Sequence, residues 1–138
     1  VAVVEDLYEA KGPLAGLVAG FEAVATPLCF ATSCDAPLLQ PGVIGLLRTH
    51  AADHDIACPL VDGFLQPLVA VYRPLACLPV FKDFVERDVL KITAAFGPLR
   101  TVLVREEELR EVDPGLKSFL NANRPERLAE IAAVLDQA

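Results

Sequence analysis

Short apolar runs alternate along the chain with segments whose apolar residues recur at helical spacing. The runs predict strands, and they lie at 1–4, 28–34, 55–60, 68–72 and 100–104. The run LCFATSC (28–34) is continuously apolar, which is typical of a strand that is covered on both faces of a parallel sheet. The pair Asp62-Gly63 predicts a turn between the third and fourth runs.

The segments at helical spacing lie at 12–25, 41–52, 74–87 and 89–96, with a last one after Asn123. Pro79 predicts a break or kink in the third of them, and Asn123 is the expected N-cap of the last. The acidic run REEELREVD (105–113) is expected to be a solvated surface segment. This alternation predicts one α/β domain (1–138), a three-layer α/β/α sandwich with a mostly parallel (mixed) sheet.

Composition limits the possible functions. No apolar stretch reaches the ~18 residues of a membrane-spanning helix, and the net charge of -7 disfavours binding to nucleic acid or to a membrane surface, because both need a basic field. The cysteines form no CxxC pair and lie in apolar stretches, so we expect reduced structural thiols in a cytoplasmic protein. They are Cys29, Cys34, Cys58 and Cys77.

Asp35 follows the apolar run 28–34 and precedes Pro37 by two positions. Ligands of α/β sheets bind at the carboxyl ends of the strands, so Asp35 is a candidate Mg²⁺ ligand for a phosphate-bearing substrate. The same carboxylate could instead cap the turn before the helix at 41–52. The residues alone leave both interpretations open.

Two other motifs offer polar groups. GPLAG (12–16) places two glycines at the start of a helix, where free N–H groups bind anions, although glycines there also serve packing alone. Asp6 fits an ordinary cap or turn residue. Asn121 and Asn123 carry amides that can bind a polar heterocycle or sugar, and they also fit a turn and a cap. No P-loop, Rossmann fingerprint or nucleophile–histidine pair is present.

The order of these motifs resembles that of the molybdenum cofactor guanylyltransferases, which are members of the nucleotidyltransferase superfamily. It runs DLYxxKGPLAG, an apolar strand that ends in CDAP, DGFLQPLVAVYR and NANRPERL, and it covers nearly the whole chain. Related nucleotidyltransferases share the GPLAG and CDxP elements, whereas NxNxPExL favours the guanylyl branch. The resemblance implies a nucleotide-diphospho-sugar transferase-like fold. It also implies transfer of GMP from GTP to the terminal phosphate of molybdopterin, with release of pyrophosphate.

The resemblance also implies roles for the matching residues. Asp35 would be the catalytic ligand of Mg²⁺, the implied cofactor. The nucleotide would contact Asp6, Gly12, Pro13, Leu14, Gly16 and Asp35, and the molybdopterin side would be lined by Gln66, Arg73, Asn121 and Asn123. GTP, molybdopterin and molybdoenzyme maturation proteins are the implied partners.

One family element has no match in this chain. The glycine-rich LAGGxSxRMGxxK loop of the family supplies a phosphate cradle together with a Lys and an Arg. Because the chain also opens on Val1 and contains no Met, we interpret it as the C-terminal two thirds of a longer protein. We expect the 138-residue chain alone to be inactive, with an exposed sheet edge.

Two other functions are compatible with the sequence. The first is a cytidylyltransferase or another nucleotidyltransferase of small phosphates, which differs in base preference. The second is a non-catalytic domain that binds the cofactor during assembly, which would lack a glycine-rich loop upstream of Val1.

Overall fold

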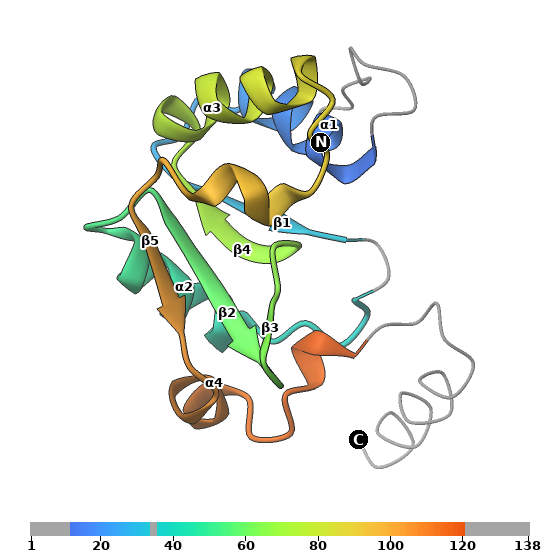
Figure 1. The fold of residues 1–138 in the computed structure, drawn as a ribbon. Helices are drawn as coiled ribbons and strands as arrows, with labels where there is room; N and C mark the ends of the chain where they lie inside the picture. Colours follow the sequence, from blue (N-terminus) through green and yellow to red (C-terminus); the bar gives the residue numbers. More distant parts are fainter. Residues whose placement is uncertain (1–11, 34–35, 121–138) are drawn as a thin grey trace.

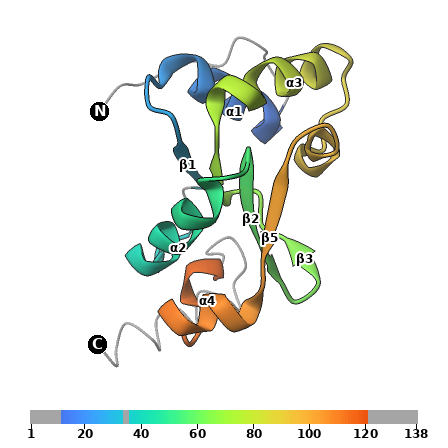
Figure 2. The same ribbon diagram turned by 90° about the vertical axis from the view of Figure 1, so that its left-hand side faces the viewer.

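A β-sheet covered by helices on both faces forms the centre of the molecule (Figures 1 and 2). The computed structural model describes residues 12–33 and 36–120. Its helices are α1 (Gly12–Ala23), α2 (Pro41–Ala51), α3 (Pro74–Glu86) and α4 (Glu106–Val112), with 3₁₀ helices η1 (Ile92–Phe96) and η2 (Lys117–Phe119). Its strands are β1 (Cys29–Thr32), β2 (Ile56–Val61), β3 (Phe64–Leu65), β4 (Val69–Tyr72) and β5 (Thr101–Val104). Within the described ranges no helix has the length and apolar character to cross a membrane.

The direction of β4 defines the topology of the sheet. The strand order is β1-β4-β2-β5, and β3 forms a short hairpin with β2. β4 is antiparallel to both β1 and β2, whereas β2 and β5 are parallel. β1, β2 and β5 therefore point the same way and β4 runs against them. The predicted α/β fold with a mixed sheet is confirmed, and β4 is its antiparallel strand.

Each face of the sheet has its own hydrophobic core, because successive residues of a strand point to opposite faces. Ile56 and Cys58 of β2 and Tyr72 of β4 join α1, α3 and η1 in a first cluster. Ala57 of β2 and Val71 of β4 join α2, α4 and β5 in a second cluster. This burial on both faces explains why the strands are continuously apolar in the sequence.

Four aromatic rings form the centre of the first cluster. The ring centroid of Tyr72 lies 5.4 Å from that of Phe21, 5.7 Å from that of Phe81 and 6.2 Å from that of Phe96. Tilted and edge-to-face pairs at these distances add about 0.5–1.5 kcal/mol each beyond the burial of apolar area. The cluster thus ties α1, α3 and η1 to one strand.

The segment after β2 begins with the predicted turn. Asp62 (φ 53°) and Gly63 (φ 78°) both have positive φ, as a type I′ hairpin turn requires. The hairpin partner is the two-residue strand β3, which was not predicted from the sequence. The predicted strand at 68–72 corresponds to β4, which pairs with the first residues of β2, Ile56 and Ala57.

Two helix predictions on this face were inaccurate. The predicted break at Pro79 is wrong, because α3 continues through this residue from Pro74 to Glu86. Pro79 and Leu75 lie on the exposed side of α3, where a carbonyl that loses its helical partner can bond to water. The helix predicted at 89–96 is reduced to η1, because Asp88 (φ 60°) ends the preceding helix with a left-handed residue.

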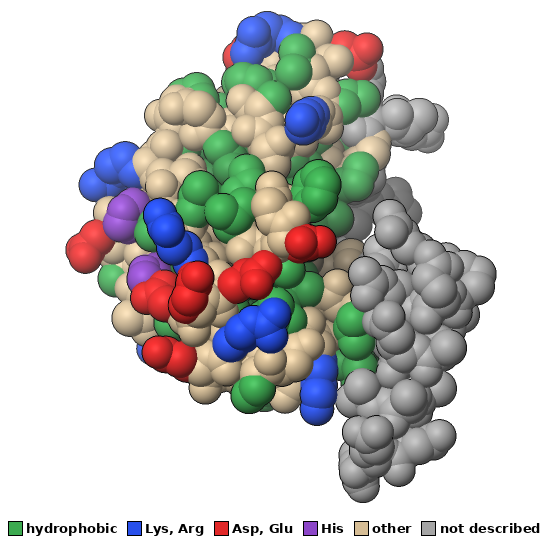
Figure 3. All heavy atoms as spheres, turned by 60° about the horizontal axis from the view of Figure 1, so that its bottom comes forward, with side chains coloured by type: hydrophobic (Ala, Val, Ile, Leu, Met, Phe, Trp, Pro, Cys, Tyr) green, Lys and Arg blue, Asp and Glu red, His purple; other side chains and the backbone are tan. Residues whose placement is uncertain are grey.

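The acidic segment 105–113 lies largely at the surface, as expected, but it also contains a helix and a fully buried leucine. Most of it forms α4, whose Leu109 is fully buried in the second cluster. The carboxylates of α4 remain at the surface, where Glu108 pairs with His50 of α2 at 3.1 Å and Glu106 with Arg110 at 3.6 Å. Figure 3 shows acidic and basic side chains gathered on this face around hydrophobic ones. The predicted strand at 1–4 and the helix after Asn123 lie outside the described residues.

The burial of Leu109 gives a test of the packing of α4 on the second cluster. We expect Leu109→Ala to lower the free energy of unfolding by about 2–5 kcal/mol, because it removes a buried side chain and leaves a cavity. The matched control is Leu75→Ala on α3, where the leucine is 90% exposed and the change should stay within about 0.5 kcal/mol. Urea unfolding of both variants measures the difference. Equal stability of the two variants would contradict the packing of α4.

Candidate functional site

The reversed direction of β4 brings the end of one strand beside the beginning of another. Thr32 at the end of β1 pairs with Val69 at the start of β4. One residue further out, the N–H of Ser33 donates to the carbonyl of Leu68 at 3.2 Å. The segment after β1 and the segment before β4 therefore meet at the carboxyl edge of the parallel strands, where α/β sheets bind their ligands.

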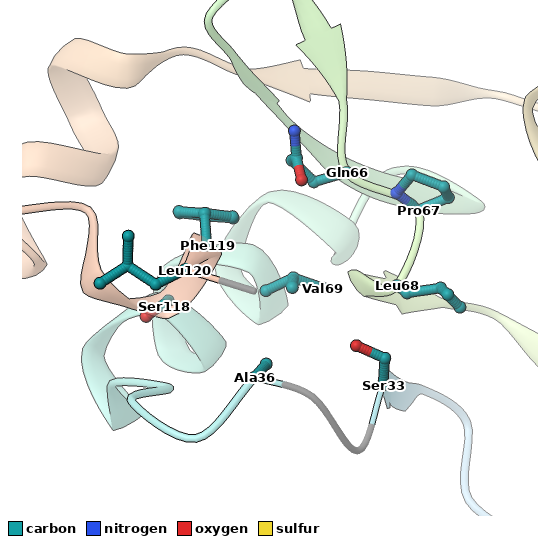
Figure 4. A pocket seen from close by; sticks show the side chains of 9 residues that line it. All are labelled: Ser33, Ala36, Gln66, Pro67, Leu68, Val69, Ser118, Phe119 and Leu120. Carbon is teal, nitrogen blue, oxygen red and sulfur yellow. The ribbon is translucent and has the colours of Figure 1, made fainter. Parts of the chain in front are cut away.

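A pocket of about 280 Å³ lies at this edge (Figure 4). Three segments line it: Ser33 and Ala36 after β1, Gln66 to Val69 before β4, and Ser118 to Leu120 at the end of η2. The polar side chains are two hydroxyls and one amide, and the rest of the lining is apolar. An apolar pocket with a few polar groups is the usual form of a small-molecule site.

The segment before β4 is held by hydrogen bonds to its neighbours. The N–H of Gln66 donates to the carbonyl of Pro59 at 2.9 Å, and the N–H of Val69 donates to the carbonyl of Gln66 at 3.1 Å. The hydroxyl of Tyr72 donates to the carbonyl of Pro67 at 2.5 Å. Burial raises the pKa of Tyr72 well above its usual range, so the phenol keeps its proton and remains a donor. The aromatic core thus supports one side of the pocket.

The segment at the end of η2 is held by a buried carboxylate. Asp113 is 2% exposed, and its two oxygens accept the N–H groups of Lys117 and Ser118 at 3.0 and 2.9 Å. The hydroxyl of Ser118 in turn accepts the N–H of Gln40 at 2.8 Å. These bonds fix the residues that form the opposite side of the pocket.

One of the predicted site residues, Gln66, lines this pocket directly. Asp35 and Asn121 lie outside the described residues, as do Asp6 and Asn123. The described neighbours of the first two nevertheless line the pocket: Ser33 and Ala36 on either side of Asp35, and Leu120 immediately before Asn121.

The GPLAG segment is not part of this pocket lining. α1 begins at Gly12, whose φ of 71° is favourable for glycine, and Gly12, Pro13 and Gly16 are exposed. The side chain of Leu14 is fully buried in the first cluster, so only its backbone could contact a nucleotide. The start of α1 lies toward the side of the molecule on which β1 ends (Figure 1).

The structure does not support the prediction that Arg73 lines the same cleft as Gln66. Arg73 follows the end of β4, and the pairing of Tyr72 with Cys29 places that end beside the start of β1. Its guanidinium donates to the carbonyls of Ala51 at 2.9 Å and of Ala52 and His54 at 3.3 Å. Arg73 therefore caps the C-terminus of α2 at the opposite edge of the sheet.

Among the described residues, the lining of the pocket contains no carboxylate that could bind Mg²⁺. In residues 12–33 and 36–120 there is no group of three His, Cys, Asp or Glu side chains that could hold a metal ion. The described lining offers neutral oxygens from Ser33, Gln66 and Ser118. Mg²⁺ is usually held by one or two carboxylates, water molecules and substrate phosphates.

The described thiols are unsuited to nucleophilic catalysis. The described cysteines Cys29, Cys58 and Cys77 form no disulfide with one another. Burial raises the pKa of Cys29 to about 11 and the pKa values of Cys58 and Cys77 to about 12. The reactive form of a cysteine is the thiolate, which these pKa values make rare.

Sequence analysis missed the residues that shape one side of the pocket, namely Asp113, Ser118 and Phe119. A local signal was present, because Asp-Pro-Gly (113–115) is a typical turn in which the aspartate caps the N–H groups that follow. The turn was not predicted, because Asp113 was counted as the last residue of the acidic segment 105–113.

A three-layer α/β fold with a mixed sheet and a pocket at its carboxyl edge is typical of α/β domains that bind small ligands at the carboxyl ends of their strands. The family model described as "MobA-like NTP transferase domain" matches residues 1–111. The chain belongs to this family of nucleotidyltransferases.

Comparison with related proteins supports this assignment. The chain is 34% identical over 131 residues to the molybdenum cofactor guanylyltransferase of Desulfosudis oleivorans, covering 94% of this chain and 64% of the relative. It is 28% identical over 136 residues to the probable molybdenum cofactor guanylyltransferase of Pelotomaculum thermopropionicum, covering 99% and 66%. The chain thus spans slightly less than two thirds of these relatives.

A solved structure shows the same fold. It is the molybdopterin-guanine dinucleotide biosynthesis protein A from Archaeoglobus fulgidus, with a TM-score of 0.81 and 26% sequence identity. The match covers 92% of this chain and 64% of that chain.

The raised pKa values predict slow thiol chemistry in the folded protein. At pH 8 we expect Cys58 and Cys77 to react with iodoacetamide roughly 100-fold or more slowly than in concentrated guanidinium chloride, because burial suppresses both access and the thiolate. Peptide mass spectrometry follows each cysteine separately. Labelling of either thiol at equal rates in the folded and denatured protein would show that the first core cluster is open to solvent.

Proposed function

We propose that the complete protein containing this chain transfers GMP from GTP to the terminal phosphate of molybdopterin and releases pyrophosphate, with Mg²⁺ as cofactor. The observation that carries the proposal is the pocket in which Gln66 meets the described neighbours of Asp35 and Asn121. Family membership and the similarity to molybdenum cofactor guanylyltransferases support the same reaction.

This transfer needs no nucleophile from the protein, because the substrate phosphate is the attacking group. An oxygen of the molybdopterin phosphate forms a bond to the α-phosphorus of GTP. The bond from the α-phosphorus to the oxygen that bridges the α- and β-phosphates breaks, and its electron pair leaves with pyrophosphate. The attacking phosphate oxygen is already anionic at neutral pH, so no catalytic base is needed. Alignment of the substrates and neutralisation of charge are the main contributions of the site.

The side chains around the pocket suit these two tasks, alignment and charge neutralisation. We assign Asp35 to the cation, which when bound neutralises charge on the phosphates. The hydroxyl of Ser33 and the amide of Gln66 offer hydrogen bonds to phosphate or pterin oxygens and nitrogens. Asn121 is proposed for the molybdopterin side, since it follows directly after the lining residue Leu120.

Three further residues complete the proposed site. Asn123 joins Asn121 on the molybdopterin side. Asp6 and the exposed backbone at the start of α1 (12–16) are proposed for the guanine nucleotide. Arg73 is left out, because its guanidinium caps α2.

The pocket lining contains no Lys or Arg among the described residues, although the triphosphate and the molybdopterin phosphate are both anionic. We propose that residues preceding Val1 supply a basic phosphate cradle, and that the 138-residue chain alone is therefore inactive. The free thiols favour a reducing compartment, so we place the reaction in the cytoplasm. Molybdoenzyme maturation proteins are the expected recipients of the product.

Nucleotide preference tests the proposed reaction. In the complete protein with Mg²⁺, we expect GTP to raise the melting temperature, because a ligand that binds the folded state stabilises it. CTP and ATP at the same concentration serve as controls and should give little shift. Protection by CTP alone would indicate a cytidylyltransferase. Protection by no nucleotide would indicate a non-catalytic cofactor-binding domain.

Asp35→Ala separates the two interpretations of this carboxylate, as a Mg²⁺ ligand or as a cap. We expect this variant to lose the Mg²⁺-dependent protection by GTP and to lower turnover roughly 100-fold or more, since a cation ligand is removed. Its melting temperature without ligand should match that of the control Asp53→Ala, which alters an exposed aspartate. Retained turnover with a stability loss of about 1 kcal/mol would instead identify Asp35 as a cap.

A further inference from the structure

Asp113 and Ser118 are the two buried polar residues of the described chain, and the structure joins them to each other. A buried carboxylate is costly unless hydrogen bonds replace its lost hydration. One carboxylate oxygen of Asp113 accepts a hydrogen bond from the N–H of Lys117, and the other accepts one from the N–H of Ser118. Such charge-assisted bonds are among the stronger ones in proteins, so the path of the chain after Asp113 is well defined.

The backbone between these residues forms a closed turn. The N–H of Asp113 donates to the carbonyl of Leu109 at 2.8 Å, which anchors the turn to α4. The N–H of Leu116 donates to the carbonyl of Asp113 at 2.9 Å, and Leu116 has a left-handed φ of 49°. The side chain of Asp113 then takes the next two N–H groups. Asp113 therefore directs the chain from α4 into η2 and the pocket.

Ser118 extends this linkage to the other side of the pocket. Its hydroxyl accepts the N–H of Gln40, the residue before α2, at 2.8 Å. The amide side chain of Gln40 donates to the carbonyl of Leu38 at 2.9 Å, which closes the loop that comes from Ala36. Ala36 and the segment Ser118 to Leu120 line the same pocket from separate parts of the chain (Figure 4).

We propose that Asp113 and Ser118 are positioning residues that fix the spacing between the two substrate halves of the site. The proposal rests on the proposed function, in which one half of the substrate pair is held near the loop that ends at Gln40 and the other near Leu120. Reaction requires the phosphate oxygen and the α-phosphorus to be closely aligned, and an error of about 1 Å can cost about 100-fold in rate. The linkage Asp113–Ser118–Gln40 supplies this alignment without touching the reacting atoms.

Substitution of a positioning residue and substitution of a purely structural residue have different effects on binding, turnover and stability. Loss of stability would lower nucleotide protection, turnover and the melting temperature together. Loss of spacing lowers turnover while each substrate still binds its own half of the site. The separation of kcat from nucleotide binding is therefore the informative measurement.

The experiment uses Ser118→Ala and Asp113→Asn in the complete protein. Ser118→Ala removes the acceptor for the Gln40 N–H and leaves both bonds of Asp113 in place. Asp113→Asn places an amide NH₂ group against a backbone N–H. Matched controls are Thr49→Ala, which deletes an exposed hydroxyl of α2, and Asp53→Asn, which neutralises an exposed carboxylate.

For both pocket variants we expect kcat to fall about 10- to 100-fold, while the protection by Mg²⁺ and GTP changes less than about 2-fold. Both controls should keep the kcat of the unaltered protein. Unchanged kcat in Ser118→Ala and Asp113→Asn would overturn the proposal. A parallel fall of kcat, nucleotide protection and melting temperature in both variants would also overturn it, in favour of a structural role.

Hydrogen exchange distinguishes failure of this inference from failure of the proposed function. If the unaltered protein transfers no GMP, the proposed function is wrong, and the alignment of its substrates is wrong with it. The linkage itself is then judged by the exchange rate of the Gln40 amide, which should rise in Ser118→Ala and remain unchanged in Thr49→Ala. An equal Gln40 exchange rate in both variants would overturn the linkage as well.

Discussion

The antiparallel pairing of β4 with β1 and β2 is the constraint on which the site depends. Because β4 runs against its neighbours, the loop before it, rather than the residue after it, reaches the carboxyl edge of the parallel strands. Gln66 and Leu68 thereby meet Ser33, and Arg73 is carried to the opposite edge. If β4 had been parallel to its neighbours, Arg73 would lie at the carboxyl edge and Gln66 at the opposite edge.

Both faces of the sheet contribute to the pocket through different means. On the first face, the aromatic cluster holds Tyr72, whose hydroxyl supports the carbonyl of Pro67. On the second face, Leu109 anchors α4, and Asp113 at its end directs η2 toward the pocket. The site is thus assembled at an edge where two independent cores end.

Much of the architecture could be predicted from the sequence, because burial on both faces and helical spacing leave clear patterns. The strand direction could not, since a short apolar run such as 68–72 has the same pattern in a parallel and in an antiparallel pair. For this reason Arg73 was expected to lie beside Gln66, whereas its guanidinium caps α2 at the opposite edge of the sheet. α4 was missed because its one fully buried side chain, Leu109, stands among charged residues that face solvent.

The position of Tyr72 has a consequence for observing the molecule. The chain contains no tryptophan and only one other tyrosine. Tyr72 joins a closely packed group of rings at one end and a carbonyl beside the pocket at the other. Its phenol emission is sensitive to that hydrogen bond, so this side chain is a natural optical reporter that links the state of the core to the shape of the pocket.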